Sequence, residues 1–296
     1  EQRLQAARPE WQKEMSAWGD KLTAAEPKWE PLNATLLETI SGLNHPTQQA
    51  DRSILMLGHT SADIFLLASP KLDGVTGLRL EALPYRDLPH NGPGRNRMGG
   101  FVLQEIEALV KLPGTKDWKK QKLANATADF SEPLVKQADG KKASGPVAHL
   151  IDGSDETTWN VDRGMGRRNQ ASVAVVQFDP PLQFPEGTEL KIVWRNNDML
   201  GCARFSITRQ AAPVAQPVDH SAMLALTIPA ADRSAEQQAA IFAAWRGGLP
   251  EAKPFNDEIA ALQKTLPQAA TSILHLAERG PTEPRQTHLL DRGSWD

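Results

Sequence analysis

One stretch of the sequence gathers side chains that could bind a metal ion. Residues 151–159 read Ile-Asp-Gly-Ser-Asp-Glu-Thr-Thr-Trp, so that oxygen-bearing side chains surround a glycine that lets the backbone turn tightly. Residues 101–109 predict a strand that carries a carboxylate, Glu105. Calcium takes about six to eight oxygen ligands and needs neither sulfur nor imidazole. The sequence therefore predicts a structural calcium site, in which the strand carboxylate faces the turn.

In this site Asp152 is expected to supply a side-chain oxygen and Ser154 its backbone carbonyl. Thr157 is expected to supply its hydroxyl or carbonyl, and Glu105 its carboxylate. Strand alternation, which is only partial here, predicts Val102, Gln104 and Ile106 on one face and Leu103, Glu105 and Glu107 on the other. Glu107 is therefore the alternative ligand, and Asp155 is expected to point to solvent. The competing interpretation is a turn that its own Asp and Ser side chains stabilise without metal.

Two glycine-containing loops carry arginines that could bind an anion. Arg95 and Arg97 lie in residues 92–100, and Arg163, Arg167 and Arg168 lie in residues 162–168. If the loops converge, their guanidinium groups could hold a carboxylate or sulfate through forked hydrogen bonds. The alternative is a solvated loop surface or internal ion pairs.

Two tryptophans are candidates for stacking on sugar rings. Trp159 follows the turn and Trp194 ends a predicted strand. Each also fits a core position, which is the more frequent use of tryptophan. The glycines of residues 92–100 join two predicted strands and do not open a helix, so they indicate a hairpin loop and not a phosphate-binding loop.

Composition excludes several functional classes. The chain has 296 residues and a formal net charge of −3, which argues against a dedicated nucleic-acid binder. Its single cysteine, Cys202, allows no internal disulfide, and there is no Cys-x-x-Cys-His motif for haem. Seven scattered histidines offer no zinc-binding spacing, and no acid/base pair stands out, so we predict no enzyme. No apolar run is long enough to span a bilayer.

The spacing of apolar residues changes twice along the chain, from a helical pattern to short strand-like runs and back to a helical pattern. Apolar residues at helical spacing predict a helix over residues 2–25, and nine short apolar runs predict a β-sandwich: 54–57, 64–68, 76–83, 101–110, 124–130, 147–151, 172–178, 189–194 and 203–208. A Ser234–Gln237 capping box predicts a helix that ends at Gly247-Gly248, and further helices are predicted over about 255–266 and 268–278.

These patterns predict four parts: an N-terminal helix and connector (1–52), the sandwich (53–209), a linker (210–233) and a C-terminal helical segment (234–296). The two helical segments are expected to pack near each other. The chain has no initiator Met and no signal peptide, and we expect it to be a fragment of a longer protein.

The turn and the strand resemble a known kind of module. The spacing Asp-Gly-x-x-x-Thr-x-Trp, with a separate Glu-Ile-Glu strand, is similar to discoidin-like (galactose-binding-like) β-sandwiches, where the two elements frame a structural calcium site. In those modules the turn precedes the strand, whereas here Glu105 comes about fifty residues earlier. A circularly permuted sandwich explains this order, because the ends of a compact domain often lie close together. Two incomplete domains would explain it too, but each would expose half a core.

A second resemblance covers nearly the whole chain. The chain resembles planctomycete and verrucomicrobial proteins that combine a cytochrome-c-like domain with two planctomycete-specific domains of unknown function. The similar stretches are residues 77–84, 92–95, 100–106, 126–131, 151–159, 203–208 and 285–293, the last resembling the start of the C-terminal domain. The chain departs from the family at Gly100, where Asn is usual, and at Asn160, where a small apolar residue is common.

The resemblance implies export to the periplasm or cell envelope and no haem in this segment. We therefore expect a non-catalytic module, carbohydrate-binding in the first interpretation, that contacts neighbouring domains of a larger protein. The alternative is a structural spacer that orients those domains, which tryptophan-bearing helices at both ends would favour. The carbohydrate-binding expectation rests on similarity of fold and not on a demonstrated site.

Overall fold

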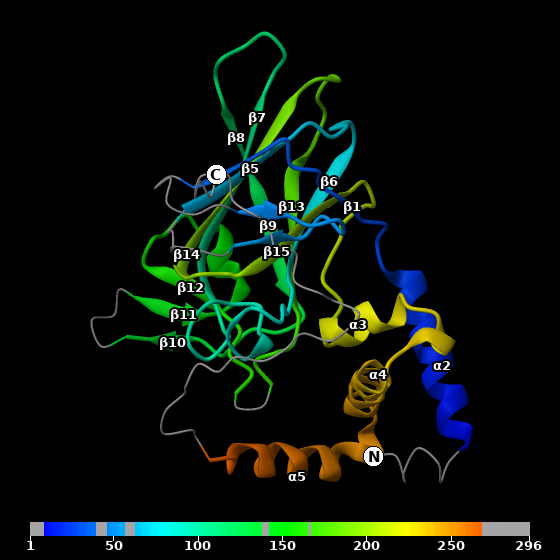
Figure 1. Cartoon of the computed structure of the whole chain (residues 1–296). Helices are drawn as coiled ribbons and strands as arrows, with labels where there is room; N and C mark the ends of the chain where they lie inside the picture. Colours follow the sequence, from blue (N-terminus) through cyan, green and yellow to red (C-terminus); the bar gives the residue numbers. More distant parts are fainter. Residues whose placement is uncertain (1–8, 40–45, 57–62, 138–141, 165–166, 268–296) are drawn as a thin grey trace, which may run out of the picture.

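The computed structural model describes residues 9–39, 46–56, 63–137, 142–164 and 167–267, and its centre is a β-sandwich (Figure 1). Sheet A runs in the order β3 (Thr47–Gln48), β4 (Ile54–Leu55), β15 (Cys202–Thr208), β6 (Val75–Ala82), β13 (Ser172–Leu182) and β9 (Leu123–Ala128), with β1 (Glu30–Pro31) paired to β15.

Sheet B runs in the order β10 (Val135–Lys136), β11 (Ala143–Gly145), β12 (Thr157–Asn160), β7 (Val102–Lys111), β14 (Glu189–Asp198), β5 (Asp63–Ala68) and β2 (Leu36–Thr39). A further strand, β8 (Lys119–Gln121), pairs with β7. The strand pairs are antiparallel apart from β11 and β12, which run parallel. The prediction of a mainly β chain built around a sandwich is confirmed.

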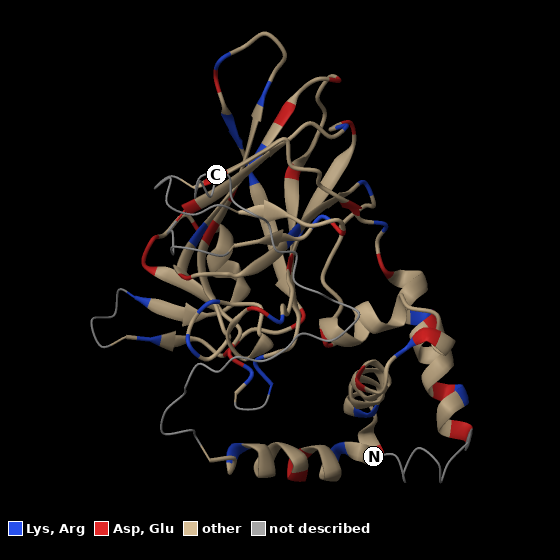
Figure 2. Ribbon diagram, in the orientation of Figure 1, with Lys and Arg blue, Asp and Glu red and all other residues tan. Residues whose placement is uncertain are grey.

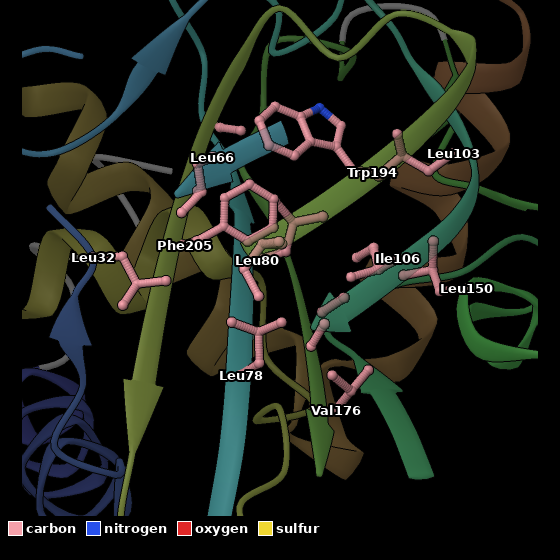
Figure 3. Close-up of a cluster of buried hydrophobic side chains, with 14 of the residues drawn as sticks. Leu32, Leu66, Leu78, Leu80, Leu103, Ile106, Leu150, Val176, Trp194 and Phe205 are labelled. Carbon is pink, nitrogen blue, oxygen red and sulfur yellow. The ribbon is translucent and has the colours of Figure 1, made fainter. Parts of the chain in front are cut away.

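The core lies between the two sheets, because alternate residues of the long strands are apolar and point inward. Trp194 of β14 packs on Phe205 of β15 with ring centroids 4.9 Å apart, which joins sheet B to sheet A (Figure 3). Trp159 packs edge-on against Phe101 at 5.7 Å. Both tryptophans are fully buried. The core interpretation of Trp159 and Trp194 is therefore correct, and their prediction as sugar-stacking platforms is wrong.

Helices pack beside sheet A. They are α2 (Pro9–Ala25), α3 (His220–Leu226), α4 (Ala235–Gly247) and α5 (Lys253–Lys264). Of these, α3 contacts β13, and the other helices pack on α3 or on one another (Figure 1). Trp11 of α2 contacts Phe242 and Trp245 of α4, with ring centroids 6.3 and 5.6 Å apart. The predicted proximity of the two terminal helical segments is confirmed, as is the Ser234–Gln237 capping box. None of the described helices is both long and apolar enough to cross a membrane.

Several predicted boundaries need correction. Residues 147–151 form a 3-10 helix and not a strand. The short strands β1, β2 and β3 belong to the two sheets, so the sandwich begins near residue 30 and not at 53. The predicted linker 210–233 contains α3, whose His220 and Ala222 are buried. Residues 2–8 of the first predicted helix, the helix predicted over 268–278 and the similar stretch 285–293 lie outside the described residues.

Candidate functional site

The turn between the 3-10 helix and β12 is held by its own polar groups. Gly153 has a φ of +75°, a conformation that glycine adopts without strain. The amide of Ser154 donates a hydrogen bond to Asp152 Oδ1 at 3.0 Å. The Thr157 hydroxyl lies 2.9 and 2.8 Å from the two carboxylate oxygens of Asp152. Three of the predicted ligands therefore share one turn.

A β-bulge on β7 brings the fourth predicted ligand to this turn. Glu105 pairs with Arg195 and Leu103 pairs with the next residue of β14, so Gln104 is an extra residue on β7. Leu103 and Ile106 are consequently both buried in the core. The predicted placement of Leu103 and Ile106 on opposite faces is wrong, because the bulge shifts the phase of the strand.

Three side chains of sheet B fasten the turn to the sheet. Glu105 Oε2 accepts a hydrogen bond from the Gly153 amide at 3.2 Å. Gln104 Nε2 donates to the Asp155 carbonyl at 3.1 Å, and Arg195 Nη1 donates to Asp155 Oδ1 at 3.1 Å. The prediction that Glu105 faces the turn is thus confirmed. Asp155 is 76 % exposed, as expected, but its carboxylate is paired with Arg195.

The carboxyl group of Glu105 lacks a cationic partner in the part of the chain that the structure describes. Glu105 is 4 % exposed, and burial raises its pKa to about 7. The Gly153 amide and more distant Lys120 oppose this rise, while the negative charges of Asp152 and Glu107 add to it. Glu107, the alternative ligand, instead pairs with Lys120 at 2.9 Å and with Arg195 at 3.5 Å.

The donor set suits a hard cation. Asp152, Ser154 and Thr157 bring a carboxylate, a carbonyl and hydroxyls to the turn, and Glu105 bonds to its Gly153 amide. Oxygen donors of this kind favour calcium. Within the described residues no group of three or more His, Cys, Asp and Glu side chains is arranged to hold a metal. A metal at this turn would therefore depend on Glu105 and Asp152 for charge, and on Ser154 and Thr157 for neutral oxygens.

A polar cleft of about 380 Å³ lies beside the turn, on β7, β11 and β12. Most of its side chains carry amide, hydroxyl or charged groups: Gln104, Gln137, Lys142, Ser144, Asp155, Glu156, Thr158 and Asn197, together with Val102 and Ala143. Thr158 and Ser144 bond to each other through their hydroxyls at 2.9 Å. Asp155 and Glu156 of the turn line the cleft, so a change in the turn would change the lining.

The arginine loops do not build this cleft. Arg163 pairs with Asp129 at 2.6 Å and stacks on Phe130 at 4.6 Å, with its side chain only 6 % exposed. Its prediction as an open ligand-binding residue is wrong, because the guanidinium compensates a buried carboxylate. Arg95 Nη1 lies 3.5 Å from Met199 Sδ, so the two loops contact different parts of the fold. Arg97 and Arg167 stay predictions as ligand-binding residues.

Sequence reasoning missed a second polar cluster, which we call the charged junction: Glu26, Arg79, Glu81, Arg204 and His220. Glu81 is fully buried and receives hydrogen bonds from Arg204 Nε at 2.7 Å and Arg204 Nη2 at 2.9 Å. His220 Nε2 lies 2.9 Å from Glu81 Oε1, and Arg79 Nη2 lies 3.1 Å from Oε2. Arg79 also pairs with Glu26 at 3.3 Å.

The charged junction joins the helices to sheet A. Burial by itself would raise the pKa of Glu81, but hydrogen bonds to His220 and Arg204 outweigh it and hold this pKa well below its usual range. Arg79 and Glu81 come from β6, Arg204 from β15 and His220 from α3. A small cavity of about 150 Å³ borders the cluster. Because all its buried charges are paired within the chain, the junction fits a structural role.

Comparison of the chain with protein-family models, curated proteins and solved structures found no match. Function is therefore inferred from the geometry of the turn, the polar cleft and the charged junction.

Proposed function

We propose that the chain is a non-catalytic module that binds a carbohydrate in the polar cleft beside the turn. The observation that carries this proposal is the lining of the cleft. Ligand pockets are usually lined mostly by apolar groups, whereas amides and hydroxyls predominate here. A sugar presents many hydroxyls that both donate and accept hydrogen bonds, and amide and hydroxyl side chains complement both roles.

The proposal includes a structural calcium ion held by Glu105, Asp152, Ser154 and Thr157. Its support is the buried carboxylate of Glu105, because buried charges in proteins are generally paired or coordinate a metal. The ion would order the turn whose Asp155 and Glu156 line the cleft. The resemblance to discoidin-like modules, where turn and strand frame calcium, agrees with this arrangement.

Paired substitutions in the cleft test the proposal. Gln137 and Asn197 are exposed, and no side-chain hydrogen bond within the described residues involves either, so Gln137→Ala and Asn197→Ala leave the fold intact. Asn169→Ala is the matched control, since Asn169 is also an exposed amide but lies outside the cleft. The chain is screened on a glycan array, and the best oligosaccharide is then titrated calorimetrically.

Each cleft variant is expected to weaken binding about three- to tenfold, the equivalent of one lost hydrogen bond. The control keeps wild-type affinity. If no neutral or acidic glycan binds, carbohydrate recognition is wrong. Equal affinity in the cleft variants and the control would place any glycan site elsewhere.

A second proposal is a structural spacer within a larger cell-envelope protein. Contacts of Trp11 with Phe242 and Trp245 support it, because they hold the two helical ends of the sandwich against each other. A spacer would hold its neighbouring domains at a fixed distance and orientation. Labels at residues 13 and 258, on α2 and α5, would then show one narrow distance distribution by electron spin resonance. A broad distribution would count against it.

A further inference from the structure

A pocket of about 270 Å³ lies between the helices. Its walls come from α2 and α4, and the end of α3 with the residues that follow it completes the lining (Figure 1). None of its lining residues lines the polar cleft or belongs to the charged junction. We call it the interhelical pocket. A ligand bound there would be separate from the glycan proposed for the cleft.

Contacts between helices flank the interhelical pocket along α2. Near one end Trp11 packs on Trp245 of α4, with ring centroids 5.6 Å apart. Near the other end Gly19 lets α3 approach closely, since a Cβ at this position would lie 2.7 Å from Leu226 Cδ2. A docked helix needs a groove that receives anchors over two or more turns. Because these contacts interrupt the groove, the pocket suits a compact ligand and not a partner helix.

Part of the lining is apolar. Met15 of α2, Leu226 of α3 and Ile241 of α4 all border the pocket. Ile241 is buried, and the other two are half-buried. The unbranched side chain of methionine adapts to ligands of irregular shape. These walls favour an aliphatic or aromatic group, in contrast to the amides and hydroxyls that line the polar cleft.

A basic and an acidic side chain lie at the same end of the pocket. Arg233 Nε and Nη2 donate to three carbonyls at the end of α3, at 2.9 to 3.3 Å, and one of these is the carbonyl of Leu226. The bonds fix the guanidinium group but leave Nη1 without a hydrogen bond to a described residue. Asp20 follows Gly19, which lies against Leu226, so it borders the pocket at the α3 end as well.

Neither of these two charges has an oppositely charged partner within the described residues. Arg233 is half-buried and Asp20 is exposed, and neither forms an ion pair there. By contrast, Arg163 and Arg204 have carboxylate oxygens at 2.6 and 2.7 Å. Figure 2 shows acidic and basic residues along α2, so the helix presents no broad field of one sign. The pocket thus offers one cation and one anion beside an apolar wall.

We propose that the interhelical pocket binds a free α-amino acid with an apolar side chain. The carboxylate of the ligand bonds to Arg233, because a guanidinium group matches carboxylate oxygens with forked hydrogen bonds. The ammonium group lies at Asp20, since both charged groups of an α-amino acid sit on one carbon and both charges of the pocket lie at one end. The side chain packs on Met15 and Ile241, where burial of apolar surface is favourable.

A zwitterion matches this pocket better than a ligand with a single charge. A fatty acid would bring its carboxylate to Arg233 and also close to the carboxylate of Asp20. An amine would meet the converse repulsion at Arg233. A free amino acid pairs with both groups and carries no net charge. Ligand sites commonly measure about 300–1,000 Å³, so a pocket near the lower limit suits a small molecule.

Calorimetric titration of the full chain with leucine and phenylalanine tests the proposal, and two blocked leucines serve as matched probes. N-acetyl-leucine keeps the carboxylate but has no ammonium group, whereas leucinamide keeps the ammonium group but has no carboxylate. Leucine is expected to bind about tenfold more tightly than either, because each blocked probe loses one charged hydrogen bond. The proposal is overturned if neither free amino acid binds, or if leucine and both blocked probes bind equally.

Substitution of the two charged residues supplies the second readout. Arg233→Gln is expected to weaken leucine binding about tenfold, and Asp20→Asn about three- to fivefold because this carboxylate is exposed. Asp117→Asn and Arg97→Gln make the same charge changes at exposed positions outside the pocket and keep wild-type affinity.

The Asp20 variant is decisive, since Arg233 also holds the end of α3 whereas Asp20 bonds to no described side chain. Asp20→Asn should lower the affinity for leucine and leave that for N-acetyl-leucine unchanged, because only leucine brings an ammonium group to this position. A role of Asp20 in folding alone would affect both probes equally. If Asp20→Asn binds leucine as tightly as the wild type does, the proposal is wrong.

Discussion

Two buried glutamates, one in each sheet, differ in their charged partners and in the direction of their pKa shifts. Glu81 in sheet A and Glu105 in sheet B are 0 % and 4 % exposed. Burial pushes both pKa values upward, yet that of Glu81 falls well below its usual range and that of Glu105 rises to about 7. The difference comes from partners: two arginines and a histidine surround Glu81, whereas Glu105 receives one backbone amide.

One carboxylate is compensated by charged side chains of the chain, and the other has no cationic partner among the described residues. At the charged junction every buried charge is paired with an opposite charge of the chain, so the cluster holds α3 against sheet A. At the turn the carboxylate charge of Glu105 has no cationic partner among the described residues, whereas exposed Asp152 accepts hydrogen bonds from Ser154 and Thr157. Calcium and a proton are the two species that would compensate the charge of Glu105.

The largest expected effect is at the charged junction. Glu81→Ala leaves Arg79 and Arg204 mostly buried with only the more exposed Glu26 and Asp51 as carboxylate partners. Removal of one partner from a buried pair costs about 3–5 kcal/mol. Urea unfolding should show this loss. Glu105→Ala is the matched comparison, and without calcium it should cost far less. Equal losses in the two variants would contradict the division into a compensated and an uncompensated site.

Calcium should stabilise the wild-type chain at the turn. Binding to the native state alone contributes about 2.7 kcal/mol when calcium is a hundred times its dissociation constant, so the melting temperature rises. Asp152→Ala should abolish the difference between excess calcium and chelator. Asp155→Ala, which removes a turn carboxylate outside the predicted ligands, should preserve it. If the wild type melts at the same temperature with calcium and with chelator, the turn binds no calcium and is stabilised by its own side chains.

Without calcium, Glu105 should make stability fall as pH rises. Its pKa is about 7 in the folded chain against an ordinary 4.5, so between these values the folded state binds more protons than the unfolded state. The free energy of unfolding should therefore decrease by about 2 kcal/mol from pH 4.5 to 7, allowing for solvent near the turn. Glu105→Gln should remove this decrease. A slope that is unchanged in Glu105→Gln would assign it to another group.

The depressed pKa of Glu81 predicts the opposite slope in a more acidic range. Its contribution is fully present above pH 4.5 and is lost as pH falls below that value. Calcium should flatten the Glu105 slope alone, since the ion favours the ionised carboxylate. Chelator-treated and calcium-loaded samples, unfolded in parallel across pH, therefore distinguish the two glutamates.

The smallest expected effect concerns the bulge residue that holds the turn. Gln104→Ala removes the hydrogen bond to the Asp155 carbonyl and should cost about 1 kcal/mol. Gln12→Ala on α2 is the control, since this exposed glutamine lies on the other side of the molecule. Amide hydrogen exchange should show faster exchange at residues 153–157 in Gln104→Ala only. Unchanged exchange there would mean that Glu105 and Arg195 suffice to hold the turn.

Local patterns predicted most of the fold because they depend on neighbours in the chain. Eight of the nine predicted strands are present, and the capping box sets the start of α4. The prediction failed for residues 147–151, where one turn of 3-10 helix buries Leu150 and presents His149 Nδ1 to the Thr158 carbonyl at 2.9 Å. The strands β1 and β3, with two residues each, are too short to show any periodicity.

The sequence by itself determined the oxygen-rich turn, the strand that faces it and the alternation that buries the sandwich core. Those features follow from residue type and spacing over short distances. Only the tertiary structure decided the partners of Glu81, because Arg204 and His220 lie 123 and 139 residues away. It also decided the phase of β7, since a bulge follows from how β14 pairs with it. Compensation of a buried charge depends on residues far apart in the sequence, so local spacing does not predict it.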